Sequence, residues 1–212
     1  MATDPVIPQY MTMGPVLPVM VIPELSQAVP LAEALIKGGI KVLEITLRTA
    51  CALDAIKEIS QAFPDAVVGA GTVLTPQDAE KAAKSGAKFL VSPGLTETLA
   101  KQDIVPLLPG VATSSEVMQA LEWGYTHLKF FPAVPAGGIG YLKGIGGPLP
   151  QAKFCPTGGI DVKNAADFLA LPNVLCVGGS WVAPALAMAD GRWDDITRLS
   201  AEAVQTFGKK QG

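Results

Sequence analysis

Short runs of apolar residues alternate along most of the chain with longer stretches in which apolar residues recur at helical spacing. Eight such runs occur, at residues 16–22, 42–47, 67–73, 89–92, 105–108, 128–131, 153–156 and 174–177. Many are rich in Val, Ile, Leu and Phe along their whole length, which is typical of parallel strands that are covered on both faces.

The stretches between the runs predict helices. Residues 31–37 and 52–62 carry apolar residues on one helical face and Lys and Glu on the other. Thr75 followed by Pro76 predicts an N-cap and a first helical residue. Further helix starts are expected at Ser114-Ser115-Glu116 and after Asp161 near Val162, and helix ends at Gly38-Gly39 and Gly86.

Eight strands that alternate with helices predict an α/β protein of one domain, a (β/α)8 (TIM) barrel. We expect a leader segment over residues 1–14, partly disordered or a short helix, and the barrel over residues 15–212, with a helical tail from residue 184. The competing fold is an open doubly wound sheet, which would need a Gly-rich fingerprint after the first strand. Pro23-Glu24-Leu25 follow that strand instead.

Composition narrows the classes of protein. Of 212 residues 49% are hydrophobic and only 17% charged, so we expect much of the surface to be hidden, partly in an oligomer interface. The net charge of -3, without a long run of Lys or Arg, argues against nucleic acid as a partner. We find no signal peptide and no apolar run that could span a membrane, so the cytoplasm is the expected location.

The cysteines and the histidine offer little for metal chemistry. Cys51, Cys155 and Cys176 lack the spacing of a metal site and are expected to be reduced, buried thiols. His127 is the only histidine, so a zinc site or a Ser-His-Asp triad has little to draw on, and we interpret it as structural. No metal and no other cofactor is expected.

Polar residues interrupt the second predicted strand. Side chains alternate along a strand, so Glu44, Thr46 and Arg48 share one face, which should point into the barrel mouth. Active sites of such barrels lie at the carboxyl ends of the strands. A buried ion pair with a purely structural role remains the alternative, although charges in so apolar a strand are costly.

The sixth strand contains a lysine among large apolar residues. Lys129 is flanked by Leu128 and Phe130, whereas the other lysines mostly lie in helical or loop segments. Burial disfavours the ammonium form, and a neutral amine can attack a carbonyl to form an imine. A strand-edge lysine that merely pairs with Glu44 is the alternative.

Glycines follow several strands. Thr157-Gly158-Gly159 and Gly178-Gly179-Ser180 end the seventh and eighth strands, where barrels of this type hold phosphate through backbone N–H groups and a hydroxyl. Gly69 and Gly71, before Thr72, suggest close approach of the backbone to a ligand. The turns at Ser92-Pro93-Gly94 and Pro109-Gly110 are interpreted as simple turns.

Together these motifs resemble the 2-keto-3-deoxy-6-phosphogluconate (KDPG) / 4-hydroxy-2-oxoglutarate (KHG) aldolases. The resemblance covers about residues 15–181, in six motifs at residues 43–49, 68–74, 92–94, 129–133, 155–160 and 178–181. It implies a homotrimeric barrel and a metal-free class I mechanism, in which Lys129 forms the Schiff base and Glu44 is the general acid/base. The implied substrates are small molecules, without nucleic acid or membrane.

The resemblance also implies binding roles. It places Arg48, Thr72 and Pro93 at the pyruvate carboxylate and the neighbouring pocket wall, with Phe131 beside the imine. Thr157 is similar to the residue that contacts the substrate hydroxyls and favours the gluconate epimer. The phosphate is expected at Gly158, Gly159, Gly179 and Ser180.

The resulting hypothesis is cleavage of 2-dehydro-3-deoxy-6-phosphogluconate to pyruvate and D-glyceraldehyde 3-phosphate, and also of 4-hydroxy-2-oxoglutarate to pyruvate and glyoxylate. Three alternatives stay open: an aldolase for the phosphogalactonate epimer, a phosphosugar epimerase, isomerase or decarboxylase on a similar barrel, and a non-catalytic protein that kept the fold. An epimerase or isomerase would not need a lysine buried in the sixth strand.

Overall fold

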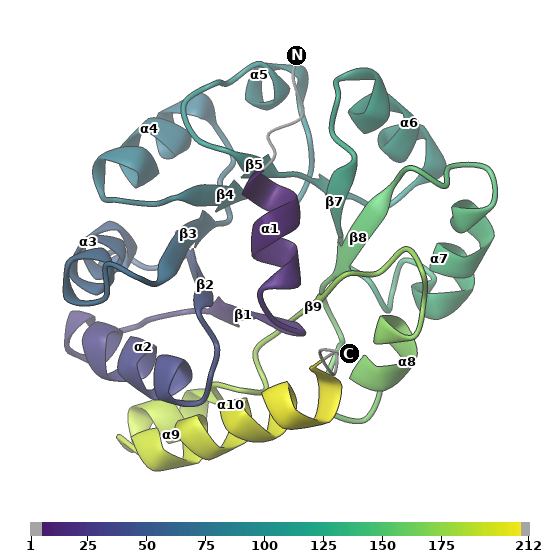
Figure 1. The fold of residues 1–212 in the computed structure, drawn as a ribbon. Helices are drawn as coiled ribbons and strands as arrows, with labels where there is room; N and C mark the ends of the chain where they lie inside the picture. The colour runs from purple at the N-terminus through teal and green to yellow at the C-terminus, as the bar shows by residue number, and fades with distance from the viewer. Residues whose placement is uncertain (1–5, 209–212) are drawn as a thin grey trace.

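The computed structural model describes residues 6–208 and has an α/β fold, in which parallel strands form a curled sheet with helices outside it (Figure 1). The strands are β1 Val16–Met20, β2 Val42–Thr46, β3 Val67–Gly71, β4 Phe89–Val91, β5 Leu107–Leu108, β6 Gly110–Val111, β7 His127–Phe130, β8 Lys153–Pro156 and β9 Val177–Gly179. The predicted alternation of strand and helix is thus confirmed.

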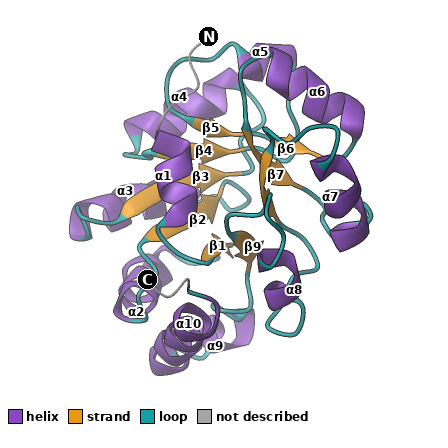
Figure 2. Cartoon of the chain, turned by 45° about the vertical axis from the view of Figure 1, so that its right-hand side comes forward, coloured by secondary structure: helices purple, strands orange, loops and turns teal. Residues whose placement is uncertain are grey.

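Helices α2 to α8 lie in segments between strands, whereas α1 precedes β1 and both α9 and α10 follow β9 (Figure 2). They are α1 Val6–Thr12, α2 Ala28–Lys37, α3 Ala52–Ala62, α4 Pro76–Lys84, α5 Glu97–Ala100, α6 Ser114–Glu122, α7 Gly138–Gly146, α8 Ala165–Leu169, α9 Ala185–Ala189 and α10 Trp193–Phe207. The predicted cap of α4 is confirmed: Thr75 Oγ1 accepts the N–H of Asp78, and the Asp78 carboxylate accepts that of Thr75, both at 3.1 Å. Each end of this capping box satisfies a backbone N–H that lacks a helical partner.

Hydrogen bonds connect the strands in two sheets, of order β5-β4-β3-β2-β1-β9 and β6-β7-β8, and all pairs are parallel. Only Pro109 separates β5 from β6. Two isolated parallel bridges, Phe154 with Val174 and Thr157 with Gly178, connect the β8 segment with the β9 segment.

Two predicted strands differ substantially from the observed ones, and others, such as those at 16–22 and 67–73, end up to two residues earlier than predicted. The predicted strand at 105–108 begins only at Leu107. The ladder is interrupted at Pro109, because proline has no N–H, and the chain continues after it as β6. The predicted strand at 174–177 shares only Val177 with β9, and Val174 contributes an isolated bridge. The helix expected near Val162 begins at Ala165, although Asp161 Oδ1 does accept the N–H of Lys163 at 2.8 Å.

The apolar core has two parts, one on each side of the sheet. Leu43 and Ile45 of β2 belong to the outer part, between sheet and helices, whereas Val42 faces inward. The inner cluster consists of Ile7, Met11, Leu17, Val42, Val67, Phe89, Val91, Leu108, Cys155 and Cys176. Ile7 and Met11 come from α1, so the leader segment includes a short helix that covers the amino-terminal end of the strands (Figure 1).

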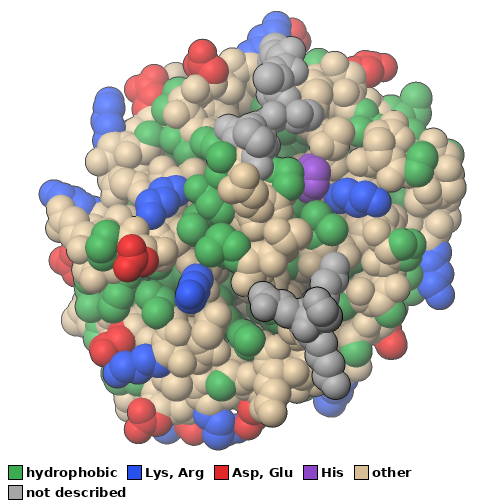
Figure 3. All heavy atoms as spheres, in the orientation of Figure 1, with side chains coloured by type: hydrophobic (Ala, Val, Ile, Leu, Met, Phe, Trp, Pro, Cys, Tyr) green, Lys and Arg blue, Asp and Glu red, His purple; other side chains and the backbone are tan. Residues whose placement is uncertain are grey.

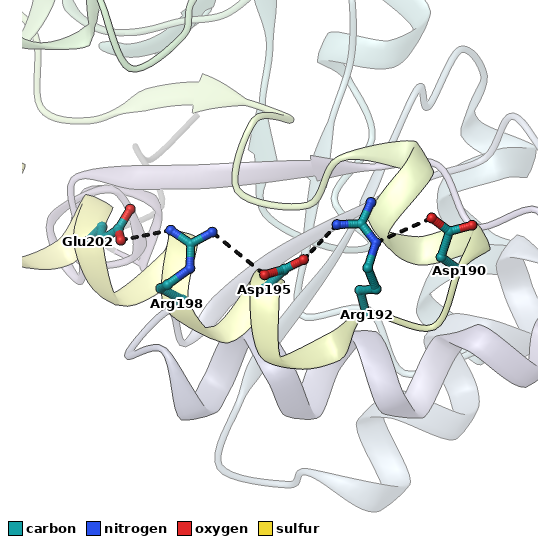
Figure 4. A network of polar contacts seen from close by, with 5 residues as sticks. All are labelled: Asp190, Arg192, Asp195, Arg198 and Glu202. Carbon is teal, nitrogen blue, oxygen red and sulfur yellow. Dashed lines mark hydrogen bonds and ion pairs between the residues drawn. The ribbon is translucent and has the colours of Figure 1, made fainter.

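The predicted helical tail is divided into α9 and α10. The chain turns at Gly191, whose φ of +65° is favourable for glycine, and one ion pair spans the turn, between Asp190 directly after α9 and Arg192 directly before α10. Arg192 lies between Asp190 and Asp195, at 3.2 and 2.6 Å, and Arg198 lies between Asp195 and Glu202, at 3.6 and 2.9 Å (Figure 4). Residues 209–212 of the predicted tail, like 1–5 of the leader, lie outside the described residues.

The surface gives no sign of one dominant charge on the face seen in Figure 3, where Lys and Arg are interspersed with Asp and Glu around hydrophobic side chains. Among the helices of residues 6–208, none has the length and apolar character needed to cross a membrane.

Candidate active site

A lysine and a glutamate from opposite parts of the sheet meet on its inner side. Lys129 is the third residue of β7 and Glu44 the third of β2. Lys129 Nζ lies 3.4 Å from Glu44 Oε1, and the two side chains are only 5% and 1% exposed. The alternation along the second predicted strand predicted the inward direction of Glu44, and the fold brings it together with Lys129, which lies 85 positions away in the sequence.

Toward the amino-terminal ends of the strands, apolar side chains surround the pair. Val42, two residues before Glu44 on the same face, belongs to the inner apolar cluster, as does Cys155, which pairs with Lys129 in the β7–β8 register. Lys129 Nζ also lies 5.3 Å from the centroid of the Phe131 ring, within the range of a cation–π interaction. The amine therefore lies in a site of low polarity with one carboxylate beside it.

The carboxylate of Glu44 is incompletely satisfied. Its Oε2 is buried and has no hydrogen-bond partner within residues 6–208. A buried acceptor without a partner is costly, which is typical of a group that serves in chemistry rather than in folding. Thr46, which was expected on the same face as Glu44, is likewise buried, and its hydroxyl donates to the Met20 carbonyl at 2.8 Å, a hydrogen bond that connects β2 with β1.

Arg48 and Thr72 meet at the carboxyl ends of neighbouring strands. Arg48 is exposed, and its Nε donates to Thr72 Oγ1 at 3.1 Å. Thr72 has a φ of +59°, the left-handed conformation that β-branched residues rarely adopt. Such a conformation costs about 1–3 kcal/mol and is concentrated at functional sites. Pro93 is exposed just after β4.

The predicted substrate and phosphate positions follow β8 and β9. Thr157 is 6% exposed and donates its hydroxyl to the Cys155 carbonyl at 3.4 Å. Gly158 and Gly159 have φ values of +102° and +78°, and within residues 6–208 no backbone acceptor is found for either N–H. Ser180 is exposed.

Two glycines of β3 have a different role from the predicted one. They were expected to let the backbone approach a ligand. A Cβ on Gly69 would collide with the Phe89 ring, and one on Gly71 with the carboxyl group of Glu44. The space beside these glycines is therefore filled by side chains of the protein itself.

Sequence reasoning missed two further glycines of this kind. A Cβ on Gly178 would collide with the Thr157 side chain, and one on Gly110 with the backbone of Pro93 and Ser92. Gly110 was interpreted as part of a simple turn, but it lets the segment that follows β4 approach β6 closely beside Lys129, its register partner. The signal that could have found both glycines is their inward position on the strands, on the same face as Lys129 or Thr157.

His127 lies at the start of β7, two residues before Lys129. Together with Trp123 and Tyr125 it lines a cavity of about 590 Å³ near the amino-terminal ends of the strands. Partial burial and the neighbouring charge of Lys153 lower the pKa of His127 below its usual value. Within residues 6–208 no group of three or more His, Cys, Asp or Glu side chains could hold a metal ion.

Comparison with known proteins gives consistent matches. Residues 7–199 match the sequence model of the KDPG and KHG aldolase family. The KHG/KDPG aldolase of Escherichia coli (strain K12) is 52% identical over 198 residues, which cover 92% of this chain and 93% of that protein. The 2-dehydro-3-deoxy-phosphogluconate aldolase of Pseudomonas aeruginosa is 48% identical over 197 residues, which cover 92% and 90%.

One solved structure is similar to this chain in both fold and sequence. It is the KDPG aldolase of Legionella pneumophila with pyruvate captured as a covalent carbinolamine intermediate. It superposes with a TM-score of 0.90 at 51% identity, and the match covers 92% of this chain and 96% of that one.

Proposed function

The chain belongs to the KDPG and KHG aldolase family, and we propose that it cleaves 2-dehydro-3-deoxy-6-phosphogluconate to pyruvate and D-glyceraldehyde 3-phosphate through an imine on Lys129. The observation that supports this most is the buried pair of Lys129 Nζ and Glu44 Oε1, 3.4 Å apart on the inner side of the sheet. A nucleophile within reach of a proton carrier is the arrangement that imine chemistry requires.

The amine of Lys129 attacks the C2 carbonyl of the keto acid, and loss of water gives a protonated imine. This imine accepts the electron pair of the C3–C4 bond while Glu44 takes the proton of the C4 hydroxyl, directly or through a water. The aldehyde leaves and an enamine remains on Lys129. Glu44 returns the proton to C3, and hydrolysis of the imine releases pyruvate. No metal takes part in these steps.

Binding is divided between two groups of residues. The guanidinium of Arg48 binds the substrate carboxylate near Thr72 and Pro93, with Phe131 beside the imine. Thr157 contacts the substrate hydroxyls and favours the gluconate epimer. Backbone N–H groups of Gly158, Gly159 and Gly179 and the hydroxyl of Ser180 bind the phosphate, which the left-handed conformations of Gly158 and Gly159 support.

We further propose that the two sheets form one closed (β/α)8 barrel, in which β5 and β6 count as one strand interrupted at Pro109. The bridges between the β8 and β9 segments support this proposal. The single domain over residues 15–212, the homotrimer and the cytoplasmic location stay predictions from the sequence.

The test is borohydride trapping. The protein is incubated with pyruvate and sodium borohydride, and the adduct is located by peptide mass spectrometry. We expect a reduced pyruvyl adduct on Lys129, and none in the Lys129→Ala variant. Lys153→Ala, which removes a lysine from the neighbouring strand β8, is the matched control and should keep the adduct. A folded protein that gives no adduct on Lys129 would refute the proposal.

A second substrate is favoured by the names of relatives, since the E. coli relative is a KHG/KDPG aldolase. We propose that 4-hydroxy-2-oxoglutarate is also cleaved, to pyruvate and glyoxylate, at the same Lys129. Ser180→Ala should raise the KM for the phosphorylated substrate and leave that for 4-hydroxy-2-oxoglutarate nearly unchanged. Equal effects on both substrates would argue against a phosphate site at Ser180.

A further inference from the structure

Gly71 lies directly beside the carboxyl group that faces Lys129. A Cβ on Gly71 would lie 2.7 Å from Cγ and 2.8 Å from Cδ of Glu44, and closer still to Oε1. Oε1 is also the oxygen that pairs with Lys129 Nζ. The position of this oxygen therefore depends on the missing side chain at residue 71.

Backbone conformation does not explain the glycine. The positive φ angles of the described residues belong to other glycines and to Thr72, so an alanine could adopt the conformation of Gly71. Strand β3 also has little freedom to move aside, because β2 pairs with it at five positions and β4 pairs with its other edge. An added methyl group would therefore displace the Glu44 side chain rather than the strand.

We propose that Gly71 is a positioning residue for the aldolase reaction: its lack of a side chain holds the Glu44 carboxyl group at Lys129. The inference rests on the role of Glu44 given under the proposed function. Gly71 touches neither substrate nor imine in this proposal and acts only through Glu44.

Gly69 offers a matched control on the same strand. It lies two residues earlier on the same inward face, and its Cβ would collide with the ring of Phe89 instead of with Glu44. Gly69→Ala therefore introduces the same methyl group into the same strand but disturbs the apolar cluster. The two substitutions separate an effect on packing from an effect on the carboxyl group.

The experiment follows exchange of the pyruvate methyl protons for deuterium by NMR, in wild type and in Glu44→Gln, each with and without Gly71→Ala. We expect Gly71→Ala to slow exchange about 100-fold or more where Glu44 is present, the range of a lost general acid/base. In the Glu44→Gln background its additional effect should stay below about threefold, because residues that act as a unit are not additive. The KM for pyruvate should change little in either background.

Equal slowing in both backgrounds would overturn the inference, as would a raised KM with an unchanged turnover, which would indicate that Gly71 acts through Thr72. Gly69→Ala should slow proton exchange by the same factor, large or small, in the wild-type and in the Glu44→Gln backgrounds. If Glu44→Gln alone leaves exchange unchanged, the role of Glu44 in the proposed function fails instead.

Folding supplies a second readout. If Gly71→Ala does not fold, the Glu44→Ala/Gly71→Ala variant should, because truncation at Cβ removes Cγ, Cδ and Oε1 of Glu44 from the collision. Failure of that double variant to fold would also overturn the inference.

Discussion

The ion pair of Lys129 and Glu44 should lower the stability of the fold relative to an apolar pair of the same shape. Lys129→Met removes the charge but keeps most of the side chain's volume. The carboxylate of Glu44, 1% exposed and with an unpartnered Oε2, then has no opposite charge at 3.4 Å. Breaking one side of such a buried pair costs about 3–5 kcal/mol, because the remaining charge stays desolvated.

This magnitude corresponds to a fall in Tm of about 6–20 °C, since each kcal/mol shifts a chain of this size by about 2–4 °C. The Lys129→Met/Glu44→Met variant should be as stable as wild type or up to about 4 kcal/mol more stable, and inactive. The pair is then retained for chemistry at the expense of stability.

Urea denaturation followed by circular dichroism, at one protein concentration for all variants, measures the free energy of unfolding. The control is Lys37→Met, which breaks a shorter pair with Glu33, at 2.8 Å, whose side chains are 65% and 50% exposed. It should leave stability nearly unchanged, since solvent screens exposed pairs. The reasoning is refuted if Lys129→Met unfolds at the urea concentration of wild type, or if the double variant is less stable than the single one.

Three further outcomes are expected. Burial and Lys153 lower the pKa of His127, so just below about pH 6.5 the unfolded state binds more protons than the folded state, and stability that is present above that pH is lost as the pH falls. Urea titrations should therefore show that His127→Gln loses less stability than wild type between about pH 7.5 and 5.5. Equal losses in the two proteins would contradict this. Thr75→Ala should cost about 0.5–2 kcal/mol in the same assay, because the capping box of α4 is lost, and an unchanged midpoint would rule out that contribution. The hydrogen bond with Cys155 and complete burial raise the pKa of the Cys176 thiol well above its usual range. Iodoacetamide should therefore alkylate half-buried Cys51 first and Cys176 only after unfolding. Alkylation of Cys176 at the rate of Cys51 would argue against this protection.

Local periodicity determined most of the secondary structure and the face on which the key side chains lie. The helix predicted at 52–62 is observed residue for residue as α3, because its amphipathic pattern and its limits are contained in the segment itself. Glu44 faces inward as alternation along the second strand predicted, since side-chain direction along a strand depends only on residue parity. Lys129 is buried, as its large apolar neighbours in the sequence indicated.

The limits of strands depended on their neighbours. The strand predicted at 105–108 begins only at Leu107, and β9 begins at Val177 rather than at 174. A strand extends only as far as hydrogen bonds to adjacent strands do, and these partners lie far away in the sequence. The same holds for the contacts of a side chain. The sequence predicted the face of the strand on which Thr46 lies, but not its hydrogen bond to the Met20 carbonyl.

The sequence by itself thus determined the family resemblance, the order of strands and helices, and Lys129 and Glu44 as candidates for the chemistry. Only the tertiary structure decided that these two side chains meet at 3.4 Å and that Gly69 and Gly71 make room for Phe89 and Glu44 rather than for a ligand. The physical reason is that periodicity is a property of consecutive residues, whereas the atoms that fill the space beside a residue come from segments that only the fold brings next to it.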